Sequence, residues 1–275
     1  MLVIGSGEQL LPEVLAAVDA QTRRPDVVVR VPRGRGLGAA VTAALADALA
    51  ETGDGHGEWL WILHADAAPA PEALERLLVA VETAPSVAVA GCKQVEWGDE
   101  QRLLDVGITT SRLGAVITGL DRGELDQGQH DSRSDVLAVR TAGMLVRRDV
   151  WQQLGGPDPA LTGARDDLEL CRRVHLAGHR VVVVPGAVTT NAAETPYRDD
   201  RRDGLTLRLA WVRGPVLPFA LLWSLLAGVV RAAVRLILKQ PQLALDELVA
   251  AGDLLARPLR WVRARRRIRR GRAVP

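Results

Sequence analysis

The sequence predicts an α/β fold in which a mostly parallel sheet is flanked by helices. Over roughly the first two thirds of the 275 residues, short apolar runs alternate with amphipathic stretches, and this alternation favours a sheet with helices on both faces. The composition is that of an ordinary globular protein, with 48% apolar and 25% charged residues. The chain is long enough for one large domain, or for a domain with an appendage.

The first elements alternate regularly. Residues 8–22 carry apolar side chains at a helical spacing, which predicts a helix. Apolar runs before and after it predict buried strands at 1–5 and 26–31. The alternation continues with an Ala-rich helix, a strand, a further helix and a further strand, at 37–52, 58–63, 71–83 and 86–92.

The next part of the domain is less regular. Residues 93–140 contain clusters of Gly, Asp and Gln, and we expect strand pairs and loops inserted into the sheet there. A strand, a helix and a last core strand are then expected at 141–150, 166–177 and 180–184.

The character of the chain changes after a polar stretch at 194–204, which we interpret as a linker. No charged residue occurs from Gly214 to Val230, a length at the lower edge of what spans a bilayer. Prolines and flanking arginines favour an interfacial or marginally spanning helix, with a buried soluble helix as the alternative. We divide the chain into an α/β domain at 1–198 and a membrane-associating part at 199–275.

The C-terminal segment from Arg257 to Arg272 is strongly basic. It contains nine arginines and no acid, so the rest of the chain is acidic although the net charge is +2. An anionic membrane surface attracts such a segment by about 1 kcal/mol per basic residue. Nucleic acid is the other obvious partner, but the preceding apolar helix favours the membrane, so no nucleic-acid partner is expected.

Two further features favour the cytoplasmic face of the cell membrane. Cys92 and Cys171 lack the spacing of a disulfide framework or a zinc site, as is usual for buried thiols in a reducing compartment. The N-terminus begins with an apolar run, and no signal peptide is visible.

His64 and Asp66 are the first candidate site residues, at the carboxyl end of the strand at 58–63. In open α/β sheets ligands gather beyond the carboxyl ends of the strands. An acid placed there can hold a divalent cation that neutralises a diphosphate. Asp66 suits equally well as the cap of the helix that begins near Pro71, so spacing alone leaves both roles open.

Asp166 and Asp167 stand at the start of the helix at 166–177. The helix dipole favours acids in the first turn, which is one explanation for the pair. A carboxylate at the mouth of a cleft is also what a general base for a sugar hydroxyl needs.

Three ordered motifs resemble those of the family 2 glycosyltransferases, which have the GT-A fold. They are HAD after a strand, then GMLVRRDVWQQLGGPDPAL, and then DDLELCRRVHLAGHRVVVVPGAV. The segment LLPEVLAAVDAQTRRPDVVVRV is similar to the opening helix and second strand of that family. The resemblance covers roughly residues 1–191, and in particular concerns actinobacterial members whose catalytic domain precedes membrane helices.

The resemblance implies a nucleotide-sugar donor bound over the first half of the sheet, and the membrane-associating part favours a glycan or lipid-linked acceptor. Asp66 matches the second acid of the family's DxD-like motif, which contacts the metal, Mg²⁺ or Mn²⁺, and the diphosphate. His64 occupies the place of the first acid. Asp167 matches the base that deprotonates the acceptor hydroxyl, with Asp166 as its acidic neighbour. Transfer in this family is typically a single displacement with inversion.

The sequence departs from the family in the donor site. Its second strand ends at Val31 and continues as Pro32 and Arg33, without the acid that holds uracil or ribose in family members. Asn191 stands where many members place a metal-binding histidine. Arg33 and Arg35, near a Gly-rich turn, are therefore candidates to neutralise the donor phosphates directly.

Other interpretations remain open. Residues 34–39 fit the GxGxxA pattern of dinucleotide-binding oxidoreductases, but they follow the second strand, and no acid ends a strand about twenty residues later. The donor-site departures also fit a catalytically degenerate relative that acts as a membrane-associated binding or scaffold protein, whereas Asp66, Asp166 and Asp167 favour an enzyme. His130, in QGQHD, is either a contact to the acceptor or a solvated loop residue.

Overall fold

A mixed β-sheet forms the centre of the protein in the computed structural model, which describes residues 2–5, 11–31, 37–52, 58–110, 116–121, 123–192 and 196–270. Within these residues, eight strands form one sheet in the order β2-β1-β3-β9-β5-β10-β4, with β6 paired to β5. Their bounds are β1 (Leu2–Gly5), β2 (Val28–Val31), β3 (Trp59–His64), β4 (Ala67–Pro69), β5 (Val87–Glu96), β6 (Asp99–Asp105), β9 (Met144–Arg147) and β10 (Arg180–Asn191). A separate hairpin joins β7 (Thr109–Thr110) to β8 (Val116–Ile117).

The direction of β9 corrects the expectation of a mostly parallel sheet. β1 is parallel to β2 and β3, and β5 is parallel to β10. Between these groups β9 pairs antiparallel with both β3 and β5, and β4 and β6 are also antiparallel to their partners. Apolar periodicity reveals which strands are buried but not their direction. A strand reached through a long irregular insertion, rather than a crossover helix, is free to enter antiparallel.

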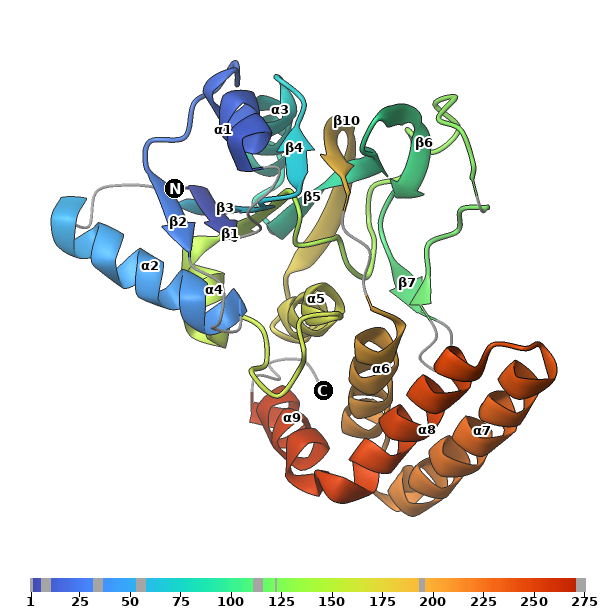
Figure 1. Ribbon diagram of the computed structural model, residues 1–275. Coiled ribbons are helices and arrows are strands. Elements are labelled where there is room, and N and C mark those ends of the chain that lie inside the picture. The colour runs from blue at the N-terminus through green and yellow to red at the C-terminus, as the bar shows by residue number, and fades with distance from the viewer. Residues whose placement is uncertain are drawn as a thin grey trace.

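Helices cover both faces of the sheet (Figure 1). On one face, α2 (Leu37–Thr52), α4 (Arg148–Leu154) and α5 (Asp166–Leu176) share a core cluster with Leu60 and Ile62. On the other, α1 (Leu11–Asp19) and α3 (Ala73–Glu82) pack on Trp61 and Leu63. Successive residues of β3 therefore face opposite layers, as a strand buried on both sides requires.

Two predicted strands have different bounds in the structure. The stretch 141–150 is a strand only to Arg147, after which α4 begins directly. The last strand extends well past residue 184, to Asn191, through a register shift between Val184 and Val188. Pro185 and Gly186 lie at this irregularity, and such residues in a run argue against a continuous strand when only the sequence is read.

The C-terminal part is entirely helical over the described residues 196–270, apart from short connections. It comprises α6 (Tyr197–Trp211), the short 3₁₀ helix η1 (Gly214–Val216), α7 (Leu217–Ile237), α8 (Pro241–Ala256) and α9 (Pro258–Arg270). These helices lie together at one end of the molecule in Figure 1. The stretch 194–204, expected as a linker, is instead helical from Tyr197, with Asp199 and Asp200 in a first turn that favours acids.

α6 joins the helical part to the α/β part. Leu207 is buried in the core cluster under α5, and Trp211 packs against that cluster. Asp203 is fully buried and accepts hydrogen bonds from the Thr162 backbone N–H at 2.9 Å and from its hydroxyl at 3.0 Å. The division of the chain near residue 198 stays a prediction, and in the structure α6 runs across it.

Candidate active site

A pocket of about 300 Å³ opens where three strands of the sheet end. His64 is the last residue of β3, Asn191 is the last of β10, and Gln94 lies near the end of β5. These strands run in the same direction, so their carboxyl ends meet at one edge, where ligands of open α/β sheets bind. Further lining residues come from the end of β6, from loops and from the start of α5: Leu104, Asp105, Arg140, Thr141, Ala142, Gly163, Ala164 and Asp167.

Asp167 is held in this pocket by hydrogen bonds to both of its carboxylate oxygens. Its Oδ1 accepts from the Leu168 backbone N–H at 2.6 Å, and its Oδ2 accepts from Arg140 Nη1 at 3.1 Å. Only 5% of the residue is exposed. A carboxylate that is held in one orientation and lines a pocket is placed to accept a proton from a bound ligand.

Arg140 bridges two carboxylates of the pocket. Its Nε donates to Asp105 Oδ2 at 3.2 Å, and Asp105 Oδ1 accepts from the Gly107 backbone N–H at 2.7 Å. Burial raises the pKa of Asp105, Arg140 opposes that shift, and Asp167 adds to it. Although burial works against its charge, Asp167 and Asp105 together hold the pKa of Arg140 above its usual value. The guanidinium therefore stays charged between the two acids.

His64 lies at the same edge, and its Nε2 is 3.0 Å from Thr141 Oγ1. Burial lowers the pKa of His64 below its usual 6.5, although the charges of Asp66 and Asp167 act in the opposite direction. The imidazole is therefore neutral at pH 7. Asp66 is half-buried in the turn that follows β3, and its backbone carbonyl accepts from the Ala192 N–H at 3.0 Å. The fold thus brings the predicted residues His64, Asp66 and Asp167 to one edge of the sheet.

The predicted metal ligands supply at most two protein groups. Among the residues that the structure describes, no group of three or more His, Cys, Asp or Glu side chains is arranged to hold a metal ion. Mg²⁺ in proteins is commonly bound by one or two carboxylates together with substrate phosphates and water. A single carboxylate such as that of Asp66 is compatible with this kind of site. Arg33 and Arg35 lie outside the described residues.

Asp166 does not line the pocket, although it precedes Asp167 in the chain. Its pKa is raised to about 8, first by burial and then by the charges of nearby carboxylates, which belong to Asp203, Asp167, Glu169 and Asp158. The Asp166 carboxyl is therefore mostly protonated at neutral pH. Its role as an acidic partner of the base stays a prediction.

Several site residues were missed because they lie in or beside the irregular stretch 93–140. Asp105 ends β6, and Arg140 and Thr141 belong to the loop that precedes β9, so the approach of that loop to α5 depends on how β9 enters the sheet. The one available signal for Arg140 and Thr141 is that they immediately precede the GMLVRR motif. His130 lines neither pocket described here, and its Nε2 lies 2.9 Å from Glu124 Oε1.

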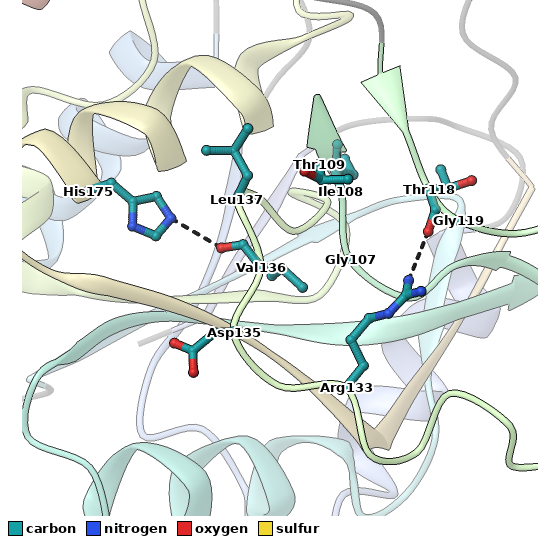
Figure 2. A pocket seen from close by; sticks show the side chains of 10 residues that line it. All are labelled: Gly107, Ile108, Thr109, Thr118, Gly119, Arg133, Asp135, Val136, Leu137 and His175. Atoms are coloured by element: carbon teal, nitrogen blue, oxygen red, sulfur yellow. Dashed lines mark hydrogen bonds between the residues drawn. The ribbon is translucent and has the colours of Figure 1, made fainter. Parts of the chain in front are cut away.

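A second pocket, of about 440 Å³, lies beside the β7–β8 hairpin (Figure 2). Arg133 Nη1 donates to the backbone carbonyls of Val106 at 2.9 Å and Thr118 at 2.8 Å. His175 Nε2 contacts the Val136 carbonyl at 3.1 Å, and Asp135 is paired with Arg180 at 2.7 Å. These polar groups are thus committed to neighbouring protein groups, whereas the first pocket gathers Asp167, Arg140 and His64.

Comparison with known proteins identifies the family and the fold of the chain. The family model described as "Glycosyltransferase like family 2" matches residues 2–214. None of the curated proteins matches the chain.

Two solved structures show the same fold. The crystal structure of GalNAc-T7 with UDP, GalNAc and Mn²⁺ superposes with a TM-score of 0.51 at 14% identity, covering 73% of this chain and 46% of that one. The crystal structure of TarS from S. aureus gives a TM-score of 0.50 at 12% identity, covering 76% of this chain and 38% of that one. The chain thus spans less than half the length of each. With its GT-A-like fold and a match that extends over most of its length, the chain belongs to the glycosyltransferases of the family 2 kind.

Proposed function

We propose that the protein transfers a sugar from a nucleotide-sugar donor to a hydroxyl of a glycan or lipid-linked acceptor, with inversion at the anomeric carbon. The observation that carries this proposal is the position of the Asp167 carboxylate in the pocket at the carboxyl edge of the sheet, where Arg140 Nη1 donates to it at 3.1 Å. Family membership supports sugar transfer in general. The inversion, the acceptor and a role in cell-envelope glycan synthesis are part of the proposal.

In the proposed reaction Asp167 acts as the general base. The acceptor oxygen forms a bond to the anomeric carbon while the bond from that carbon to the diphosphate oxygen breaks. The hydroxyl proton moves to Asp167, and the nucleoside diphosphate leaves with the electron pair. A single displacement of this kind inverts the anomeric configuration.

Arg140 prepares Asp167 for this role and keeps a partner after the proton has moved. Before transfer it orients the Asp167 carboxylate through the hydrogen bond from its Nη1. Once Asp167 is protonated, Arg140 remains paired with Asp105, 3.2 Å from its Nε. The positive charge in the pocket is therefore never left without a carboxylate, which limits the cost of neutralising the base.

We assign the donor diphosphate to the end of β3, where His64 lines the pocket and Asp66 follows in the next turn without lining it. A divalent cation bound there would neutralise charge on the leaving diphosphate. Asp66 would hold it, and the neutral His64 imidazole, bonded to Thr141, would orient the adjacent edge of the pocket.

A catalytically degenerate homologue that serves as a scaffold is the alternative. Asn191 supports it, because this residue stands in place of a metal-binding histidine, and its amide Nδ2 lies 3.3 Å from Gln94 Oε1. The lack of an acid at the end of β2 points in the same direction.

Calorimetric titration of UDP, GDP and TDP into the protein, with and without Mn²⁺, tests the donor side. The wild type is compared with Asp66→Asn and with Asp135→Asn, a control whose carboxylate is 61% exposed and lies at the other pocket. We expect one nucleotide to bind in a Mn²⁺-dependent way, and only Asp66→Asn to lose that dependence. If none of the nucleotides binds, the scaffold replaces the transferase as the better account.

A further inference from the structure

The longest apolar helix of the protein is largely uncovered. Gly214–Ile237 is long and apolar enough to cross a membrane, yet only 22% of its most apolar window is buried. A core helix of a soluble protein passes the same composition test, but such a helix is mostly buried. The exposed fraction reaches 68% at Phe219, 65% at Leu222 and 80% at Ile237. Burial in the core of a soluble protein therefore does not explain why this helix is apolar.

α7 is two-sided. Its buried positions are small residues, which recur every fourth residue and belong to Ala220, Ser224, Gly228 and Ala232. This stripe faces α8, since a Cβ on Gly228 would lie 2.8 Å from the Ala251 Cβ. The large apolar side chains occupy the remaining surface, including Leu222, Leu226, Val229 and Val230. α8 lies beside α7 in Figure 1 and adds exposed Leu245, Leu248 and Leu255.

A buried carboxylate fixes α7 to the rest of the protein. Glu247 of α8 has an exposed fraction of 0% and accepts a hydrogen bond from the Tyr197 hydroxyl of α6. Its other oxygen accepts from Arg231 Nε of α7 at 2.9 Å, and Arg201 of α6 lies 3.3 Å away. One side chain thus ties α6, α7 and α8 together.

This network is incompatible with α7 crossing a bilayer. A spanning α7 would carry Arg231 into the hydrocarbon or pull it away from Glu247, and both changes are costly because they leave a charge in a poor environment. Arg235, one turn further along α7, stacks over the Tyr197 ring at 5.5 Å. Since α6 is in turn packed into the core of the glycosyltransferase part through Leu207, α7 is a fixed outer face of the molecule.

The charges around this face match an anionic lipid surface. Between Arg213 and Lys239, which are exposed at the two ends of the helix, the sequence contains no acid. Arg263 and Arg266 are exposed on α9, which packs on α6 and α8 rather than on α7. Basic residues that flank an apolar helical face are the pattern of helices that lie in a membrane interface.

We propose that α7 lies parallel to the membrane, with its large apolar side chains in the boundary between headgroups and acyl chains of an anionic bilayer, and does not cross it. The occupant of the exposed face is therefore lipid. The inference is independent of sugar transfer, since it rests on α7, α8 and the Glu247 network and not on the pocket.

Vesicle flotation of the purified full-length protein tests the lipid contact. We expect binding to vesicles of phosphatidylcholine with phosphatidylglycerol, and weaker binding to phosphatidylcholine alone. The triple variant Leu222→Ser/Leu226→Ser/Val229→Ser should lower partitioning by at least about tenfold. The control Val79→Ser/Leu125→Ser removes apolar side chains that are 54% and 46% exposed elsewhere, and should bind as the wild type does. The proposal is overturned if the triple variant floats with vesicles as the wild type does. If the substitutions change only the oligomeric state, the apolar face contacts a second copy of the chain and not lipid, which overturns the proposal as well.

Cysteine labelling tests the orientation. Gly214→Cys and Gln242→Cys place exposed thiols just before and just after α7, while Cys92 and Cys171 are buried and burial raises the pKa of each thiol to about 12. Each full-length variant is expressed in cells. Sealed inverted membrane vesicles prepared from these cells are then treated with a membrane-impermeant maleimide. A helix in the plane gives equal labelling at both positions. Labelling at only one position, with the other reached after detergent is added, shows a spanning helix and contradicts the proposal.

Discussion

Arg140 Nη1 lies 3.1 Å from Asp167 Oδ2, and the same guanidinium reaches Asp105 through its Nε. The proposed base is thus one arm of a carboxylate–guanidinium–carboxylate arrangement that is largely buried. Removing the cation would leave Asp105 and Asp167 without the charge between them. The pKa of Asp105 is already raised, first by burial and to a smaller extent by the charge of Asp167, and Arg140 opposes this shift. The charge of Arg140, and not only its shape, should matter for transfer.

Arg140→Gln should therefore shift the acid limb of the pH–rate profile to higher pH and lower kcat at neutral pH. Arg140→Lys keeps the charge and should restore much of both. The measurement is the rate of nucleoside diphosphate release between pH 5 and pH 9 for the three proteins. A Gln variant with a reduced rate but an unshifted profile would assign Arg140 a purely structural role.

Asp166 should make the stability of the protein depend on pH. Its pKa in the folded protein is raised to about 8 from the usual value of 3.8, so between these two values the folded state holds a proton that the unfolded state has lost. The contribution of Asp166 to the free energy of unfolding is therefore fully present below its pKa in the unfolded state. It is lost as the pH rises through its pKa in the folded state, by at most about 1.4 kcal/mol per pH unit.

The test compares urea unfolding of the wild type and Asp166→Asn at several pH values from 5 to 8. The difference in the free energy of unfolding, variant minus wild type, should increase steadily as the pH rises. Taking this difference removes the contribution of groups that do not interact with Asp166, such as His64, whose pKa is also shifted. A difference that does not change with pH would show that the Asp166 carboxyl is ionised throughout.

Two neighbouring arginines of α9 should have opposite phenotypes. Arg265 is buried, and its Nη1 donates to the carbonyls of Leu209 and Ala210 at the end of α6, at 3.1 and 3.4 Å, and also to that of Val212. Arg266 is exposed. Arg265→Gln should lower the free energy of unfolding by about 1–3 kcal/mol, because buried carbonyls lose their donor.

Arg266→Gln should leave unfolding unchanged within about 0.5 kcal/mol and weaken flotation with anionic vesicles. Urea unfolding and vesicle flotation of both variants provide the comparison. Equal loss of vesicle binding in the two variants, without a difference in stability, would mean that the basic segment acts only through its total charge.

The elements that the sequence predicted well are those governed by local patterns. The helix at 37–52 and the start of the helix at Asp166 agree with the structure, because helical periodicity and acids in a first turn are visible in a short window. The strand-end position of His64 and Asp66 follows from the same kind of local information. Two of the motifs that carry the family resemblance, HAD after the strand and DDLELC at the start of the helix, lie in such locally defined segments.

What the sequence did not reveal depends on contacts between distant segments. The antiparallel entry of β9 places Arg140 and Thr141 beside α5 and His64, and no local pattern encodes that direction. The basic segment from Arg257 was interpreted as a membrane contact as a whole, whereas Arg265 and Arg267 donate to backbone carbonyls at the ends of α6 and α4. Such roles require knowing which helix ends lie nearby.

The central claim is that Asp167 is the base of a sugar transfer. It is tested most directly by the rate of nucleoside diphosphate release from a panel of UDP-, GDP- and TDP-sugars in the presence of membrane lipid acceptors, for the wild type, Asp167→Asn and the control Asp135→Asn. The account predicts that Asp167→Asn lowers kcat by about 10²–10⁴-fold while nucleotide affinity and Tm change little, and that Asp135→Asn behaves as the wild type does. Transfer by Asp167→Asn at the wild-type rate would contradict the account.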